Sequence, residues 1–121
     1  MVLVDTSVWV AHLRKGKIGL EKLLDEGEVV CHPFVIGELA CGNLKNRTEI
    51  LALLQTLPTA IQADEEDVMH FIETHRLMGK GLGYIDMHLL TSALLSEVPI
   101  WTLDRKLSET ASNFGLGFKQ K

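Results

Sequence analysis

The sequence predicts an α/β fold with a mostly parallel central sheet and helices on both faces of that sheet. Short apolar runs of strand length alternate along the chain with longer segments of helical character. The strand candidates, such as residues 2–4 and 100–102, are continuously apolar, which is typical of strands buried on both faces. The 121 residues are 46% hydrophobic and 23% charged, an ordinary globular composition that suits a single domain over residues 1–121.

Local signals place the elements of the first half. The cluster at residues 5–7, Asp-Thr-Ser, follows the first apolar run and is a good helix cap. Gly27 stops a helix, and Pro33 suits the first turn of another. The expected elements are a strand at 2–4, a helix from 8 to about 16, a helix at 19–26, a strand at 28–31, and helices at 34–41 and 46–54.

The second half begins with four consecutive acids at residues 64–67. We interpret them as the capped, dipole-favoured start of a helix and not as a metal cluster, because contiguous helical residues do not share one face. The expected elements are a strand at 59–61, a helix from 64 to about 78, a flexible glycine-rich break at 79–83, a helix at 85–96, a strand at 100–102, a helix at 104–114 and a final strand near 117–118.

Two acids follow strands directly. Asp5 comes at the carboxyl end of the first strand, and Asp104 comes just after the strand at 100–102. Ligands of open α/β sheets bind beyond the carboxyl ends of the strands, so both side chains face one crevice if the two strands are neighbours. Taken alone, each of these acids is equally compatible with helix capping.

Two further acids lie on apolar helix stripes. The same-face neighbours of Glu38, within residues 34–42, are apolar or small, and Asp86 is followed at helical spacing by Leu89 and Leu90. An ionised carboxylate buried there without a partner would be costly, which favours a functional role. The alternatives are a Glu38 that reaches solvent from the edge of its stripe and an Asp86 placed in a first turn by the helix dipole.

Four converging carboxylates would repel one another and raise one another's pKa values, and a divalent cation would remove that repulsion. Oxygen donors without a nearby His and Cys set favour Mg²⁺ or Mn²⁺. Cys31, His32 and Cys41 lack a fourth ligand for zinc. A hard cation polarises a phosphoryl oxygen and lowers the pKa of a bound water, so the natural reaction is hydrolysis of a phosphodiester.

The motifs around these acids resemble those of the PIN domain. They are Asp5-Thr6-Ser7 after an N-terminal strand, Pro33-x-x-x-x-Glu38-Leu39, Tyr84-Ile85-Asp86-Met87-His88-Leu89-Leu90 and Thr102-Leu103-Asp104-Arg105-x-Leu107. Their order and spacing, over essentially the whole chain, resemble the VapC-type toxin ribonucleases of prokaryotic toxin–antitoxin pairs. Met87 is a small departure, since small residues are frequent at that position.

This resemblance implies a three-layer α/β/α fold and an endoribonuclease that depends on Mg²⁺ or Mn²⁺. It also implies a homodimer and a small antitoxin partner. The residues that carry over are the catalytic acids Asp5, Glu38, Asp86 and Asp104, of which Asp5, Asp86 and Asp104 are the expected metal ligands, and the supporting polar residues Ser7 and Thr102.

The net charge of −4 is unusual for a passive nucleic-acid coat, which would be basic. RNA binding therefore requires a local basic rim, a bound cation or both. The candidate rim residues are Arg14, Lys15 and Arg105, which Lys17, Lys45, Arg47 and Lys106 could join. For any single one of them, a solvated loop position is an equally simple reading.

Other features concern location and partners. The two cysteines are expected to be reduced core residues of a cytoplasmic protein. No apolar run is long enough for a transmembrane helix, and the first residues lack the basic region of a signal peptide. The aliphatic segments 20–24 and 50–54 are either core or a surface for a second subunit or a partner helix.

Competing functions fit less well. A response-regulator receiver domain needs an acidic pair after its first strand, and an aspartyl-phosphate phosphatase needs a second Asp where this chain has Ser7. The stronger alternative is a non-catalytic PIN-like module that binds RNA or protein. Such modules usually lose acids, whereas all four are present here.

Overall fold

The computed structural model describes residues 1–120, and its centre is a parallel three-stranded sheet. The strands are β1 (Val2–Val4), β2 (Val29–Val30) and β3 (Ile100–Trp101), in the order β2-β1-β3. Leu3 of the central strand is paired with Val30 on one side and with Ile100 on the other. All residues of the three strands are buried, which confirms the parallel sheet predicted from continuous apolar runs.

Two of the expected strands are reduced to single bridges. Cys31 bridges to Thr59 and Ile100 bridges to Gly117, both in parallel orientation. The strands predicted at 59–61 and 117–118 are therefore wrong as strands, although each segment does lie at an edge of the sheet. Thr59 and Gly117 are exposed, so these two segments lack the continuous run of buried residues that the three strands of the sheet have.

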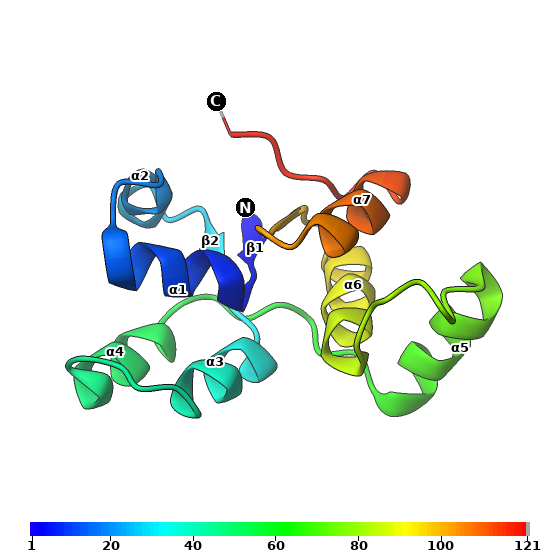
Figure 1. Cartoon of the computed structure of the whole chain (residues 1–121), viewed down its shortest axis with the longest axis horizontal. Helices are drawn as coiled ribbons and strands as arrows, with labels where there is room; N and C mark the ends of the chain where they lie inside the picture. Colours follow the sequence, from blue (N-terminus) through cyan, green and yellow to red (C-terminus); the bar gives the residue numbers. More distant parts are fainter. Residues whose placement is uncertain (121) are drawn as a thin grey trace.

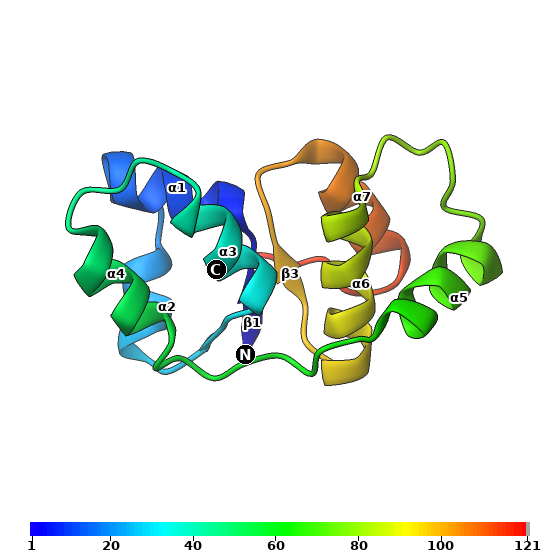
Figure 2. The ribbon, with the colours of Figure 1, turned by 90° about the horizontal axis from the view of Figure 1, so that it is seen from below.

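The helices form two groups, one on each side of the strands (Figures 1 and 2). This arrangement is the predicted three-layer α/β/α fold. Among the described residues, none of the helices combines the length and apolar character needed to cross a membrane. The first group is α1 (Thr6–Lys15), α2 (Leu20–Asp25), α3 (Pro33–Ala40) and α4 (Arg47–Leu54), and the second is α5 (Glu65–His75), α6 (Tyr84–Ser96) and α7 (Arg105–Asn113).

Helix α5 shows why local sequence predicts the start of a helix better than its end. The Asp64 carboxylate accepts the backbone N–H of Asp67, and the Asp67 carboxylate accepts the backbone N–H of Asp64. This capping box confirms that the acidic run is the capped start of a helix. The helix ends at His75, earlier than the expected end near Met78. Arg76 adopts a left-handed conformation, φ 52°, which terminates the helix.

A continuous apolar cluster surrounds the sheet and includes both tryptophans, Trp9 and Trp101, as predicted. Both cysteines are free, but only Cys31 is a core residue. The expectation that Cys41 is buried is wrong. Helix α3 ends at Ala40, and Cys41 lies at its exposed C-cap, beyond the face that packs on the core.

Candidate active site

Asp5 directly follows β1 and is buried, with 7% of its surface exposed. It occupies the N-cap position of α1, yet its side chain makes no capping hydrogen bond. Its Oδ2 atom instead accepts hydrogen bonds from Ser7 Oγ at 2.8 Å and Thr102 Oγ1 at 2.7 Å. The capping alternative for Asp5 therefore does not describe its carboxylate, which is oriented toward the end of β3.

The same two hydroxyl groups hold the loop that leads to Asp104. Ser7 Oγ accepts the backbone N–H of Leu103 at 3.0 Å, and Thr102 Oγ1 accepts that of Asp104 at 3.0 Å. Each hydroxyl thus donates to Asp5 and accepts from the loop. This geometry fixes the backbone of Asp104 relative to the carboxylate of Asp5.

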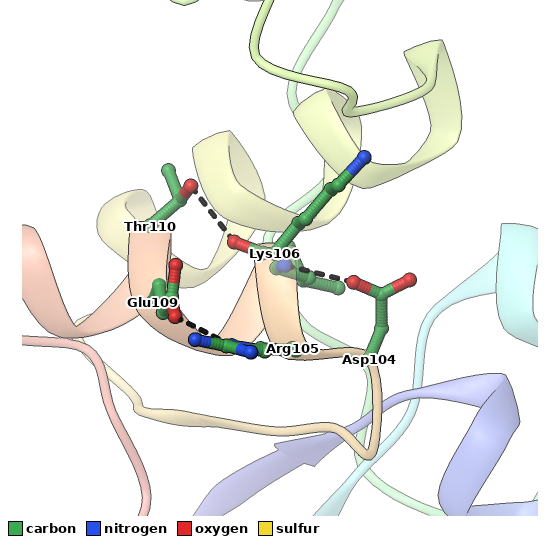
Figure 3. Close-up of polar contacts among 6 residues, drawn as sticks. Asp104, Arg105, Lys106, Glu109 and Thr110 are labelled. Carbon is green, nitrogen blue, oxygen red and sulfur yellow. Dashed lines mark hydrogen bonds and ion pairs between the residues drawn. The ribbon is translucent and has the colours of Figure 1, made fainter.

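Asp104 is exposed and caps helix α7. Its Oδ1 atom accepts the backbone N–H of Leu107 at 3.0 Å (Figure 3). The capping interpretation therefore holds for one oxygen of this carboxylate. No hydrogen bond within residues 1–120 uses its other oxygen, so capping does not prevent Asp104 from binding a ligand.

Asp86 is half-buried in the first turn of α6 and accepts the backbone N–H of Gly83 at 3.0 Å. Burial raises the pKa of the Asp86 carboxyl above its usual value, and repulsion from Asp5 and Asp104 raises it further. The Gly83 N–H group opposes this shift. Asp5, Asp86 and Asp104 are therefore brought near enough for their charges to interact.

Glu38 lies apart from the buried face of its helix. Val35 and Leu39 of α3 face the core, whereas Glu38 is exposed, so the expectation of a buried carboxylate on the apolar stripe is wrong. Its Oε1 atom accepts a hydrogen bond from Thr6 Oγ1 at 2.9 Å. Because Thr6 follows Asp5 directly, this bond holds Glu38 near the segment that carries Asp5.

The donor set fits a hard divalent cation, since it consists of carboxylate and hydroxyl oxygens. Within residues 1–120, no three His, Cys, Asp or Glu side chains form a group that could hold a metal ion as they stand. Mg²⁺ keeps several of its waters and needs only one or two direct carboxylates, so the spacing remains compatible with this ion. A cation bound there would offset the repulsion from Asp5 and Asp104, which adds to the effect of burial in raising the pKa of Asp86.

His32, considered from the sequence only as a zinc ligand, joins the helices that carry Glu38 and Asp86. His32, fully buried, caps α3 by accepting the Phe34 N–H at Nδ1, and its Nε2 atom lies 3.1 Å from Ser92 Oγ of α6. Burial, followed by the charge of His88, lowers the pKa of His32 to about 4. The only sequence signal was its position before Pro33, at an N-cap.

The structure gives the three rim candidates different surroundings. Arg14 is exposed and lines a pocket together with Glu38, whereas Lys15 is exposed outside that pocket. Arg105 pairs with Glu109 along α7, with Nε 2.9 Å from Oε1 (Figure 3). Their contact with RNA stays a prediction.

Comparison with known proteins assigns the family. The sequence profile of the PIN domain matches residues 2–113. The chain is 39% identical over 122 residues to Ribonuclease VapC32 of Mycobacterium tuberculosis, covering 100% of this chain and 98% of the relative. It is 25% identical over 123 residues to Ribonuclease VapC1 of Methanocaldococcus jannaschii, covering 99% of this chain and 88% of the relative. The chain therefore belongs to the PIN-domain family.

Proposed function

We propose that this protein is a divalent-metal-dependent endoribonuclease and acts as the toxin of a type II toxin–antitoxin pair in the cytoplasm. The single observation that carries the enzymatic part is Asp5. It is a buried carboxylate at the carboxyl end of the central strand, it is not used for capping, and it interacts with the charge of Asp86. The two relatives named as VapC ribonucleases support the same activity.

The chain's own residues then have distinct tasks. Asp5, Asp86 and Asp104 would hold Mg²⁺ or Mn²⁺, which supplies a Lewis acid for the phosphoryl oxygen and lowers the pKa of a bound water. Ser7 and Thr102 orient Asp5 through their hydroxyl groups. In the proposal, Glu38 faces the substrate from the edge of the site and can accept a proton, while Thr6 fixes the direction of its side chain.

The test is cleavage of single-stranded RNA by the purified chain. We expect cleavage with Mg²⁺ or Mn²⁺, none with EDTA, and none from the Asp86→Asn variant under any of these conditions. Asp25→Asn is the matched control, because Asp25 is an exposed aspartate at the end of α2, and it should cleave like the wild type. RNA binding without cleavage would instead favour the non-catalytic module. Cleavage in EDTA would contradict the proposed dependence on a divalent metal ion.

A partner surface is supported by an apolar groove of about 330 Å³ between α1, α2 and α4. Trp9, Leu24 and Ile50 line it, and Leu53 beside them is 63% exposed. We propose that an apolar segment of a small antitoxin covers this groove and that a basic antitoxin side chain reaches the acidic site. Leu53→Asp should abolish inhibition by the antitoxin while RNA cleavage persists, and full inhibition of this variant would contradict the groove.

We also propose that the chain forms a homodimer. Exposed aliphatic residues of the second helix group, among them Leu94 and Leu95, offer surface that a second copy would cover. Light scattering at high micromolar concentration should give twice the mass of one chain. A monomer with full RNA cleavage would contradict the dimer and leave the nuclease proposal intact.

A further inference from the structure

A second pocket lies beside Glu38 and opens between α1, α3 and α4. Its volume is about 520 Å³, within the range of small-molecule sites. Glu38 forms part of its wall and accepts a hydrogen bond from the hydroxyl of Thr6, the residue after Asp5. The pocket is therefore a neighbour of the proposed cleavage site, and it meets the apolar groove at Leu13 and Ile50, which line both.

The lining of this pocket combines apolar and polar side chains. Leu39, only 1% exposed, and the half-buried Leu44 and Ile50 provide the apolar part. The side-chain amides of Asn43 and Asn46 add groups that both donate and accept hydrogen bonds. Such a surface suits a flat aromatic ring with polar edges.

Two cations, Arg14 and Lys45, stand at the same pocket in a protein whose net charge is −4. Both are exposed, and within residues 1–120 neither takes part in an ion pair or a side-chain hydrogen bond. Arg47, at the start of α4, is already engaged, because it donates to the Ala40 carbonyl oxygen at 2.9 Å. Arg14 and Lys45 are therefore available for an anion.

The loop that forms one wall is held in place. The guanidinium of Arg47 donates twice to Ala40, from Nε at 3.3 Å as well as from Nη2, and so closes the segment 41–46. Asn46 adopts a left-handed conformation, φ 54°, that turns the chain into α4. A wall that is already ordered loses little conformational entropy when a ligand binds.

We propose that this pocket binds one nucleotide of single-stranded RNA, adjacent to the phosphate that is cleaved, with the base against Leu44 and Ile50 and a phosphate beside Arg14 and Lys45. The inference rests on the proposed nuclease function and names the part of the substrate that this chain grips. Apolar side chains, side-chain amides and a pair of free cations together match a nucleotide, whereas a partner helix suits the more apolar groove beside Trp9 and Leu53. Such a pocket would also select which base flanks the cut.

The test compares two double variants of equal charge. Arg14→Gln with Lys45→Gln removes the pocket cations, and Lys22→Gln with Lys119→Gln removes two lysines beside Met1, at the amino end of the sheet. Each pair takes the net charge from −4 to −6. Binding of a labelled short single-stranded RNA is followed by fluorescence anisotropy in EDTA, in an Asp5→Asn background that prevents cleavage.

We expect the pocket pair to lose about tenfold in affinity and to lower the slope of log K against log salt by about 0.7, for the one phosphate beside the two cations. The control pair should keep both values. Equal behaviour of the two pairs, or no RNA binding by the unsubstituted protein, would overturn the inference.

A third variant tests whether the base enters. Gly42→Leu adds a side chain at the pocket wall, where a Cβ atom meets only the Leu39 carbonyl oxygen at 3.4 Å. It should weaken RNA binding without changing the salt slope, and unchanged affinity in a folded variant would refute base insertion. Cleavage by the wild type in Mg²⁺ is measured separately. If the wild type cleaves RNA but the pocket variants bind RNA as the control variants do, only this inference is refuted. If the pocket variants lose RNA binding but the wild type does not cleave RNA, only the proposed nuclease activity is refuted.

Discussion

Replacing Asp5 by Asn removes one negative charge from the acidic site while nearly preserving the shape of the side chain. The remaining amide oxygen can still accept the hydrogen bonds of Ser7 and Thr102, which at present both reach Oδ2. The substitution therefore separates the charge of Asp5 from its role as a structural acceptor. That separation makes it the sharpest test of the proposed site.

Two opposing effects set the change in stability. A hydrogen bond to a neutral acceptor is weaker than one to a charged acceptor by about 1 kcal/mol, so two bonds lose about 2 kcal/mol. Removing a carboxylate that is 7% exposed and that repels Asp86 returns a similar amount. We expect a net change within about 1 kcal/mol, which is about 5 °C in Tm for a domain of this size.

The effect on activity should be far larger. A lost metal ligand removes several kcal/mol of transition-state stabilisation, so we expect RNA cleavage to fall by at least about 1,000-fold. Initial rates in Mg²⁺ are compared with those of Asp25→Asn, and Tm is measured in EDTA. Cleavage above a tenth of the wild-type rate would refute a catalytic role for Asp5. A Tm loss well beyond 5 °C would show that the charge itself is needed for folding.

Three further predictions use other residues. Asp86→Asn should raise Tm at pH 7 in EDTA, because the raised pKa of Asp86 means that its negative charge destabilises the folded chain. The gain in Tm should vanish below pH 3.8, the usual pKa of the group, where Asp86 is protonated in both the folded and the unfolded chain. An unchanged Tm at pH 7 would contradict this prediction. The pKa of His32 is lowered to about 4, so on acidification below about pH 6.5 the unfolded chain binds a proton at this residue before the folded chain does. Urea titrations should therefore show that about 3 kcal/mol of the free energy of unfolding is lost by pH 4. The His32→Gln variant should show a smaller dependence of stability on pH. Asp104→Ser keeps a capping oxygen for Leu107 N–H and should lose cleavage at unchanged Tm, whereas Asp104→Ala should also lose about 1 kcal/mol; equal Tm values would argue against the cap.

The fold was predictable because its strands are continuously apolar and its helices carry clear start signals. Short hydrophobic runs were enough to predict the strand β1 and its neighbours, and local capping residues were enough to predict the start of α5. The end of α5 and the single bridge at Thr59 were not predictable. A left-handed residue at Arg76 and the extent of an edge pairing depend on tertiary contacts that local sequence does not encode.

The candidate site shows the same division. The positions of Asp5 and Asp104 after strands followed from the general rule for parallel sheets, but their different uses of the cap position did not. Helical spacing placed Glu38 on an apolar stripe, yet it could not tell the centre of the stripe from its edge. The contact between His32 and Ser92 joins residues 60 positions apart and leaves no local pattern.

The order of the strands bears on when the protein can become active during synthesis. The central strand β1 is made first, but its partner β3 and the hydroxyl of Thr102 arrive almost last. Until then Asp5 lacks one of its two hydroxyl donors, and Asp86 and Asp104 have not been made or placed. A nascent or truncated chain therefore cannot assemble the proposed acidic site. The proposed acidic site is therefore complete only after Thr102 and Asp104 have been translated and the strand β3 has paired with β1.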